Sequence, residues 1–198
     1  MLVAFAKAYA LVLSMVDDLA SIRGLHDLIG SVLEELKMHE SVATKWGVDM
    51  ESSEYSVPNQ ATSRYTEFLL EVARDHTGPV PVSATLAAMV PCMRLYSHIG
   101  QKLHFAFKTT MHENPYGEWV RTYSDSAMEE AARVIESLLN RHYEREMAAE
   151  SSSEMHPAVV ANYKTAMQLE YDFFDAQEPP VSLFCENSAS SDSCTESR

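Results

Sequence analysis

The sequence is poor in the residues that make tight turns, with 6 Gly and 8 Pro among 198 residues. Hairpins depend on such residues, whereas much of this chain repeats apolar residues every three or four positions, as helices do. Because turn signals for a β-protein are missing, we expect an all-α fold. The length suits one domain with a sizeable core.

Three further shortages restrict the class of protein. The three cysteines are too few for a disulfide framework. The 15 Lys and Arg stand against 29 Asp and Glu, and this net charge of −14 argues against nucleic acid and anionic membranes as partners. No run approaches the roughly 18 uncharged apolar residues of a membrane span. We therefore expect a cytoplasmic protein with no nucleic-acid or membrane partner.

Signatures of common cofactor and metal sites are missing as well. The sequence has neither a glycine-rich phosphate loop nor a Gly-x-Ser-x-Gly elbow. Glu34, Glu35 and His39 could share one helix face as metal ligands, but no matching Glu-x-x-His follows on another helix. We expect no metal and no cofactor.

Six helical segments are predicted. The first, residues 2–16, is apolar on most faces, and Lys7 within its apolar run favours a buried helix over a secretory signal peptide. The second covers residues 22–46, and the third is capped by Thr62 or Ser63. The fourth covers residues 83–107, with a kink or a start near Pro91. The fifth follows Asn114-Pro115, breaks near Tyr123 and continues to residue 143 from a Ser126–Glu129 capping box, and the sixth covers residues 157–177. The polar composition of residues 178–198 predicts a disordered tail after a domain of residues 1–177.

Cys92 and Tyr96 stand four residues apart, so both side chains project from one helix face. Met89, Ile99 and Leu103 share approximately that face, which predicts that the thiol and the phenol point inward. One interpretation is a nucleophilic thiol. The other is a buried Cys that packs as a small hydrophobic residue, and the spacing alone favours it.

Glu170 falls within an apolar stripe of the last segment, which consists of Val160, Tyr163, Met167 and Phe174. A carboxyl buried there must be paired, hydrogen-bonded or protonated, and a buried carboxyl of raised pKa is a candidate general acid. A position at the edge of the stripe, with the carboxyl in water, fits the pattern equally well.

Three tyrosines fall on core-facing or helix-start positions: Tyr65, Tyr96 and Tyr123. A buried tyrosine needs a partner for its hydroxyl. Together the three would line a pocket for a flat, hydrogen-bonding ring, whereas each one alone is consistent with an ordinary core aromatic.

Several segments resemble the TenA (thiaminase II) family: residues 91–96 (Pro-Cys-Met-Arg-Leu-Tyr) with Gly100, residues 114–123, and residues 169–174 (Leu-Glu-Tyr-Asp-Phe-Phe). Residues 34–39 and 64–70 look closer still to the plant form, in which a TenA-like domain is joined to a haloacid-dehalogenase-type phosphatase acting on thiamin monophosphate. The resemblance covers residues 2–177.

The resemblance implies a heme-oxygenase-like helical bundle, assembled as a homotetramer, that works in thiamin salvage. It implies a hydrolase (thiaminase II or aminopyrimidine aminohydrolase) that releases hydroxymethylpyrimidine from aminopyrimidine breakdown products of thiamin, and some members also cleave thiamin. In the family mechanism Cys92 adds to the pyrimidine ring as thiolate, and Glu170 protonates or hydrogen-bonds a ring nitrogen. Tyr65, Tyr96 and Tyr123 match tyrosines of the family's substrate pocket.

Two departures accompany the resemblance. Family members carry an N-terminal helical section before the point that matches Leu2, with an Asp that contacts the substrate's amino group. Asp17 and Asp18 lie downstream and do not replace it, so we expect a bundle that lacks this section. A catalytically impaired binding or assembly module is the resulting alternative. At the other end, residues 178–198 lack the apolar strand and Asp-x-Asp of a haloacid-dehalogenase domain.

Overall fold

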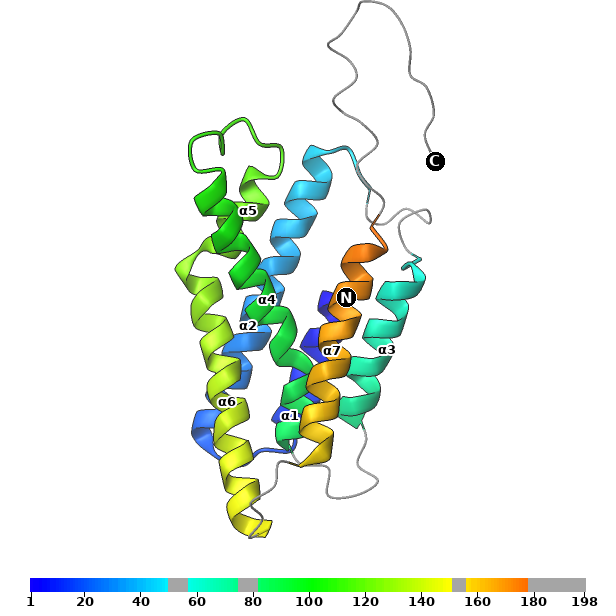
Figure 1. Ribbon diagram of the computed structural model, residues 1–198, viewed down its shortest axis with the longest axis vertical. Helices are drawn as coiled ribbons and strands as arrows, with labels where there is room; N and C mark the ends of the chain where they lie inside the picture. The colour runs from blue at the N-terminus through cyan, green and yellow to red at the C-terminus, as the bar shows by residue number, and fades with distance from the viewer. Residues whose placement is uncertain (50–56, 75–81, 151–155, 178–198) are drawn as a thin grey trace, which may run out of the picture.

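A computed structural model of the chain describes residues 1–49, 57–74, 82–150 and 156–177. Seven helices occupy these ranges: α1 (Leu2–Leu13), α2 (Leu19–Lys45), α3 (Gln60–Arg74), α4 (Val82–Ala106), α5 (Gly117–Ser124), α6 (Ser126–Glu150) and α7 (Pro157–Asp175). The long helices stand side by side, and the short α5 lies at one end of the bundle (Figure 1). No strand occurs within the described ranges, so the all-α expectation is confirmed. The expected polar tail, residues 178–198, lies outside them.

The first helix is buried, as its apolar composition predicts. Phe5, Ala8, Tyr9 and Val12 are each at most 2% exposed and face the core. α1 packs against α2, α3 and α4, and it ends at Leu13, before the expected end at residue 16.

Two helices begin earlier than the apolar pattern predicts, because polar side chains just before them act as caps. The side chain of Asp18 accepts a hydrogen bond from the Ser21 amide at 3.1 Å, so α2 begins at residue 19. The side chain of Asn59 accepts one from the Thr62 amide at 2.8 Å. The predicted cap at Thr62 or Ser63 is therefore wrong, since both lie inside α3.

The predicted Ser126–Glu129 capping box at the start of α6 is also wrong. Asp125 caps this helix, because its side chain accepts a hydrogen bond from the amide of Ala127 at 2.8 Å. The carboxylate of Glu129 turns away from the helix end and binds Arg94 of α4 instead.

The central helix is α4, which packs against α1, α3, α5, α6 and α7. It runs through Pro91 without a break, so the alternative of a start near that residue is wrong. Every residue from 83 to 93 is buried. The segment that carries Cys92 is therefore surrounded by other helices.

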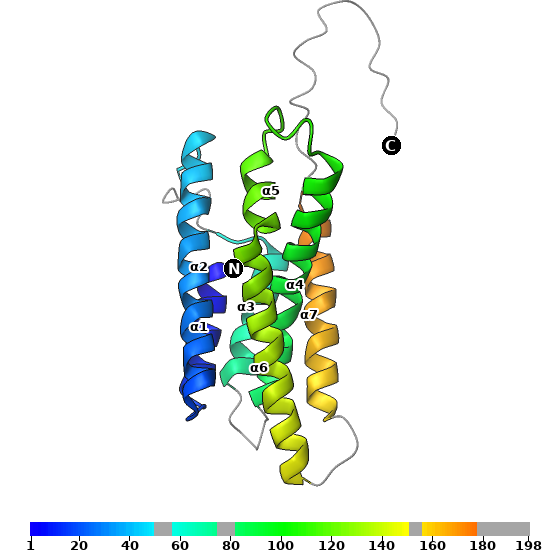
Figure 2. The ribbon, with the colours of Figure 1, turned by 90° about the vertical axis from the view of Figure 1, so that its left-hand side faces the viewer.

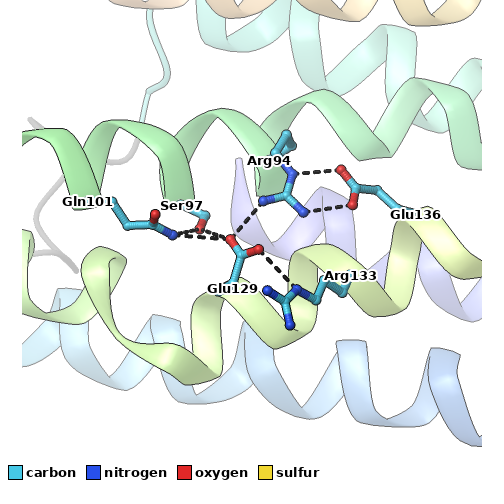
Figure 3. A network of polar contacts seen from close by, with 6 residues as sticks. All are labelled: Arg94, Ser97, Gln101, Glu129, Arg133 and Glu136. Carbon is cyan, nitrogen blue, oxygen red and sulfur yellow. Dashed lines mark hydrogen bonds and ion pairs between the residues drawn. The ribbon is translucent and has the colours of Figure 1, made fainter.

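A polar network joins α4 to α6 (Figure 3): Arg94, Ser97 and Gln101 come from α4, and Glu129, Arg133 and Glu136 come from α6. Arg94 donates two parallel hydrogen bonds to the Glu136 carboxylate, at 2.6 and 2.7 Å, and a third to Glu129 at 2.7 Å. The hydrogen bond from Ser97, followed by the bond and charge of Arg94, lowers the pKa of Glu129 to about 2. Bidentate pairing of this kind is specific in geometry and fixes the register of α4 on α6.

Candidate active site

Cys92 lies in the middle of α4 and is 8% exposed. Tyr96, one turn further along, is also 8% exposed, so the prediction that both side chains point inward is confirmed. Burial raises the pKa of the Cys92 thiol well above its usual value, and the nearby carboxylates of Glu170 and Glu35 raise it further. The thiol therefore needs a base beside it before it can act as a nucleophile.

Glu170 projects from α7 into the core and is fully buried. The hydroxyl of Tyr65 in α3 donates a hydrogen bond of 2.6 Å to its Oε1. Its Oε2 has no hydrogen-bond partner among the described residues. Burial raises the pKa of this carboxyl, and its contacts with the Tyr65 hydroxyl and the Cys92 thiol oppose that shift. A carboxyl with a raised pKa next to a thiol can accept its proton and deliver it elsewhere.

The stripe that predicted the burial of Glu170 is not the buried face of α7. Tyr163, Met167 and Phe174 are 38%, 39% and 39% exposed, whereas Val159 and Ala166 share the buried face with Glu170. Periodicity placed the large apolar residues in the core, but the smaller residues are the ones that α7 presents to α4. Glu170 is thus buried at the edge of the expected stripe, on the side where the smaller residues lie.

Tyr9 is a polar group near the thiol that the sequence pattern did not single out. It is fully buried in α1, and its hydroxyl has no hydrogen-bond partner among the described residues. Burial raises its pKa well above the usual value, and the charges of Cys92 and Glu35 add to that effect, which places Tyr9 close to both. Tyr9 is the one hydroxyl-bearing residue in α1, and this is the signal that could have identified it.

A cavity of about 1000 Å³ opens beside Cys92. Its walls include Glu35, His39, Cys92, Tyr96, Trp119 and Tyr123. Of the residues expected at the site, Cys92, Tyr96 and Tyr123 therefore meet at this cavity. Tyr65 and Glu170 are not part of its wall and form a hydrogen-bonded pair in the adjoining core, next to the thiol.

Aromatic rings gather on one side of this cavity. The ring of Tyr96 has its centroid 5.1 Å from that of Tyr123, 6.1 Å from that of Trp119 and 5.6 Å from that of Phe174. Trp119 and Tyr123, both from α5, are 4.4 Å apart. Such a cluster offers a flat heteroaromatic ring both stacking surfaces and hydroxyl groups.

A second acidic group meets the cavity from α2. The hydroxyl of Tyr123 donates a hydrogen bond to Glu35 Oε1, and it lies 3.2 Å from Nε2 of His39. The same His39 nitrogen is 3.8 Å from Glu35 Oε1. Glu34 takes no part, because it is 73% exposed and pairs with Lys37 at 2.6 Å. Of the three residues considered as metal ligands, the structure brings together Glu35 and His39 but not Glu34.

α2 stands at the edge of the bundle, and its upper half is separate from α5 in Figure 2. Side chains connect the two helices: Glu35 to Tyr123, Lys45 to Glu118, and Trp46 to Tyr116 just before α5, with ring centroids 5.6 Å apart. A second cavity, of about 610 Å³, shares Glu35 and Tyr123 with the first, so both residues of this contact line two cavities.

Comparison with known protein families shows to which family the chain belongs. It matches the TENA/THI-4/PQQC family over residues 1–178. The protein belongs to this family. Its helices accordingly form a heme-oxygenase-like bundle, the fold that the TenA resemblance implied, and the site described above is that of a TenA-family protein.

Three TenA relatives show how far the likeness extends. The chain is 36% identical over 188 residues to the mitochondrial bifunctional TH2 protein of Arabidopsis thaliana. This alignment covers 88% of the chain and 29% of the TH2 protein. The chain is 27% identical over 175 residues to the aminopyrimidine aminohydrolase of Halalkalibacterium halodurans, covering 88% and 74% of the two chains. A TenA family transcription regulator from Silicibacter sp. TM1040, whose crystal structure is known, superposes with a TM-score of 0.76 at 26% identity and covers 88% and 75%.

The chain thus spans less than a third of the length of its Arabidopsis TenA relative. No helix in the described part of the chain is long and apolar enough to cross a bilayer. The cytoplasmic location stays a prediction, and the Arabidopsis relative is named as mitochondrial.

Proposed function

We propose that this chain is a hydrolase of thiamin salvage that releases hydroxymethylpyrimidine from aminopyrimidine breakdown products of thiamin, with thiamin itself as a further substrate. The observation that carries the proposal is the placement of the Cys92 thiol, in a cavity wall rich in aromatic rings and beside the buried carboxyl of Glu170. A relative named aminopyrimidine aminohydrolase supports the substrate class.

Cys92 and Glu170 have separate roles in the first half of the reaction. Glu170, whose pKa is raised by burial, takes the proton of Cys92, because a carboxylate of higher pKa is a stronger base. The thiolate adds to a carbon of the pyrimidine ring, and the bond from the exocyclic methylene to the leaving amine breaks with its electron pair on nitrogen. The proton on Glu170 hydrogen-bonds a ring nitrogen, which makes the ring a better electrophile.

The tyrosines bind the substrate and position the groups that act on it. Tyr96 and Tyr123 flank the ring from the cavity wall. Tyr65 stays a predicted substrate-binding residue, and its hydrogen bond to Glu170 gives it a second, positioning role, since it holds one carboxyl oxygen and leaves Oε2 for the ligand.

The test is the release of hydroxymethylpyrimidine from aminomethylpyrimidine by the purified chain, with the Cys92→Ser variant beside it. We expect turnover by the parent chain and a loss of at least about 10³-fold in the variant, because a serine hydroxyl is a far weaker nucleophile than a thiolate. Equal rates would refute the role of Cys92. Ligand binding without turnover by the folded parent chain would instead indicate a non-catalytic binding module.

We also propose a homotetramer, as the family resemblance implies. Exposed apolar side chains on one face of α7 support an interface there: Tyr163, Met167, Tyr171 and Phe174. Sedimentation velocity should give one species of four chains, and Tyr163→Glu with Tyr171→Glu should shift it to smaller species. A parent chain that sediments as a monomer would contradict the proposal.

A further inference from the structure

We propose that Glu35 is the general base that activates water for the second half of this reaction, with Tyr123 and His39 as its positioning residues. This inference rests on the function proposed above, which requires that water replace the leaving amine on the methylene carbon. Nothing in that first half of the reaction uses the carboxylate on α2.

Glu35 and Cys92 come from different helices and line one cavity. Cys92 is supplied by α4 and Glu35 by α2, and the cavity has a volume of about 1000 Å³. The two groups are close enough that the charge of Glu35 affects the thiol. The side chain of Glu35 is 15% exposed, so it is partly screened from solvent and still reached by water. A substrate held by Cys92 would therefore share the cavity with this carboxylate.

Two neighbours hold the carboxylate in place. The hydroxyl of Tyr123, which is 1% exposed, donates to Oε1 of Glu35, and His39 lies against both groups. With Oε1 engaged, Oε2 is the oxygen that is left to bind water. Tyr123 also packs on Tyr96, so the group that orients the base is part of the aromatic surface that receives the ring.

Glu170 is poorly placed for the same task. It lies in the core next to the thiol, and in the proposed sequence it holds the proton that came from Cys92 and uses it to hydrogen-bond the ring. Water reaches the methylene carbon from the cavity, and in the proposed sequence Glu170 is already protonated at this stage. The second half of the reaction therefore needs a separate proton acceptor on the cavity side.

Protons and electron pairs balance over the proposed second half of the reaction. Glu35 takes a proton from water as the water oxygen bonds to the methylene carbon. The electron pair of the exocyclic double bond moves into the ring, and the carbon–sulfur bond breaks with its pair on sulfur. Cys92 recovers its proton from Glu170, and the proton on Glu35 passes to the released ammonia. Over both halves of the reaction, protonated aminomethylpyrimidine and water give hydroxymethylpyrimidine and ammonium.

The experiment compares Glu35→Gln with Glu40→Gln, an exposed position on the same helix. Aminomethylpyrimidine is added in excess, samples are quenched in acid at short times, and both the product and the intact protein mass are measured. We expect Glu40→Gln to behave as the parent chain. In Glu35→Gln the adduct on Cys92, with the mass of the substrate less ammonia, should form at least as fast as in the parent chain but disappear at least roughly 10²-fold more slowly, so that it accumulates.

The outcomes separate the two proposals. Parent-like turnover by Glu35→Gln, or slow turnover without accumulation of the adduct, overturns the role of Glu35 and leaves the proposed function intact. A parent chain that forms neither adduct nor product overturns both. Circular dichroism and thermal melting of Glu35→Gln keep a folding defect apart from a catalytic one, and Tyr123→Phe should accumulate the same adduct to a smaller extent if its hydroxyl positions the base.

Discussion

A methyl group added at Gly100 would lie 2.4 Å from the carbonyl carbon of Tyr123. α4 and α5 therefore meet backbone to backbone at this point, and the absence of a side chain at Gly100 permits the contact. Since Tyr123 lines the cavity and Cys92 lies two turns earlier on α4, this contact sets the distance between Cys92 and one wall of the cavity.

Gly100→Ala should destabilise the protein by about 1–3 kcal/mol, because the new methyl group meets rigid backbone and the two helices must separate. Gly30→Ala is the matched control, since nothing lies within 4 Å of a methyl group at that exposed position of α2. It should stabilise the protein by about 0.5–1 kcal/mol through helix propensity. Urea unfolding of both variants measures the difference, and a Gly100→Ala protein as stable as the parent would contradict the close contact.

The thiol of Cys92 should react slowly with iodoacetamide at neutral pH, because burial and two carboxylates raise its pKa. Glu170→Gln removes the larger of the two charge effects, so it should lower the pKa and speed alkylation at a fixed pH, because alkylation needs only the equilibrium fraction of thiolate. Glu35→Gln should do so to a smaller extent. Turnover by Glu170→Gln should still fall, since the variant has lost the proposed base. The rate is followed against pH by mass spectrometry of the peptide that contains Cys92, with Glu40→Gln as the control. A rate unchanged in Glu170→Gln would show that its carboxyl does not act on the thiol.

Tyr65→Phe should cost about 1–3 kcal/mol, because it leaves the buried Oε1 of Glu170 without its hydrogen bond. The same bond lowers the pKa of Glu170, so its loss should move that pKa further upward, seen as an upward shift in the pH dependence of turnover. Tyr9→Phe is the control, since the hydroxyl it removes has no hydrogen-bond partner in the described part of the chain, and it should leave stability unchanged or improved. Equal losses in the two variants would rule out a special role for the Tyr65 bond.

Glu129 should contribute stability that disappears in acid. Its pKa in the folded protein is about 2, below the ordinary value of 4.5, so the folded state holds the ionised form more strongly than the unfolded state does. The contribution is complete above about pH 5 and is lost as the pH falls through 4.5 toward 2. Thermal melting of the parent and of Glu129→Gln should therefore differ at pH 7 and converge near pH 2. Glu130→Gln, at an exposed neighbouring position, should track the parent throughout.

Helical periodicity was sufficient to predict the all-α class and the inward orientation of Cys92 and Tyr96, because both depend on spacing within one helix. Helix starts were less predictable, since Asp18, Asn59 and Asp125 act through single hydrogen bonds that no apolar pattern reports. These local features account for most of the differences between the expected and the observed helices.

The site was predictable only in part. The spacing of large apolar residues could not show which side of α7 is buried, because the smaller residues of α7 are the ones that pack against α4. The contact between Glu35 and Tyr123 joins residues 88 positions apart, and a sequence pattern within one helix carries no information on such a pair. The sequence pattern offered Tyr65 and Glu170 as candidates, the family resemblance gave each an expected role, and the structure places the two within hydrogen-bonding distance.

The contact between Tyr123 and Glu35 couples two spaces of the molecule. Because both residues belong to the walls of both cavities, a substitution at either position changes the lining of the two spaces at once. A variant made to alter one cavity must therefore also be assayed for its effect on the other.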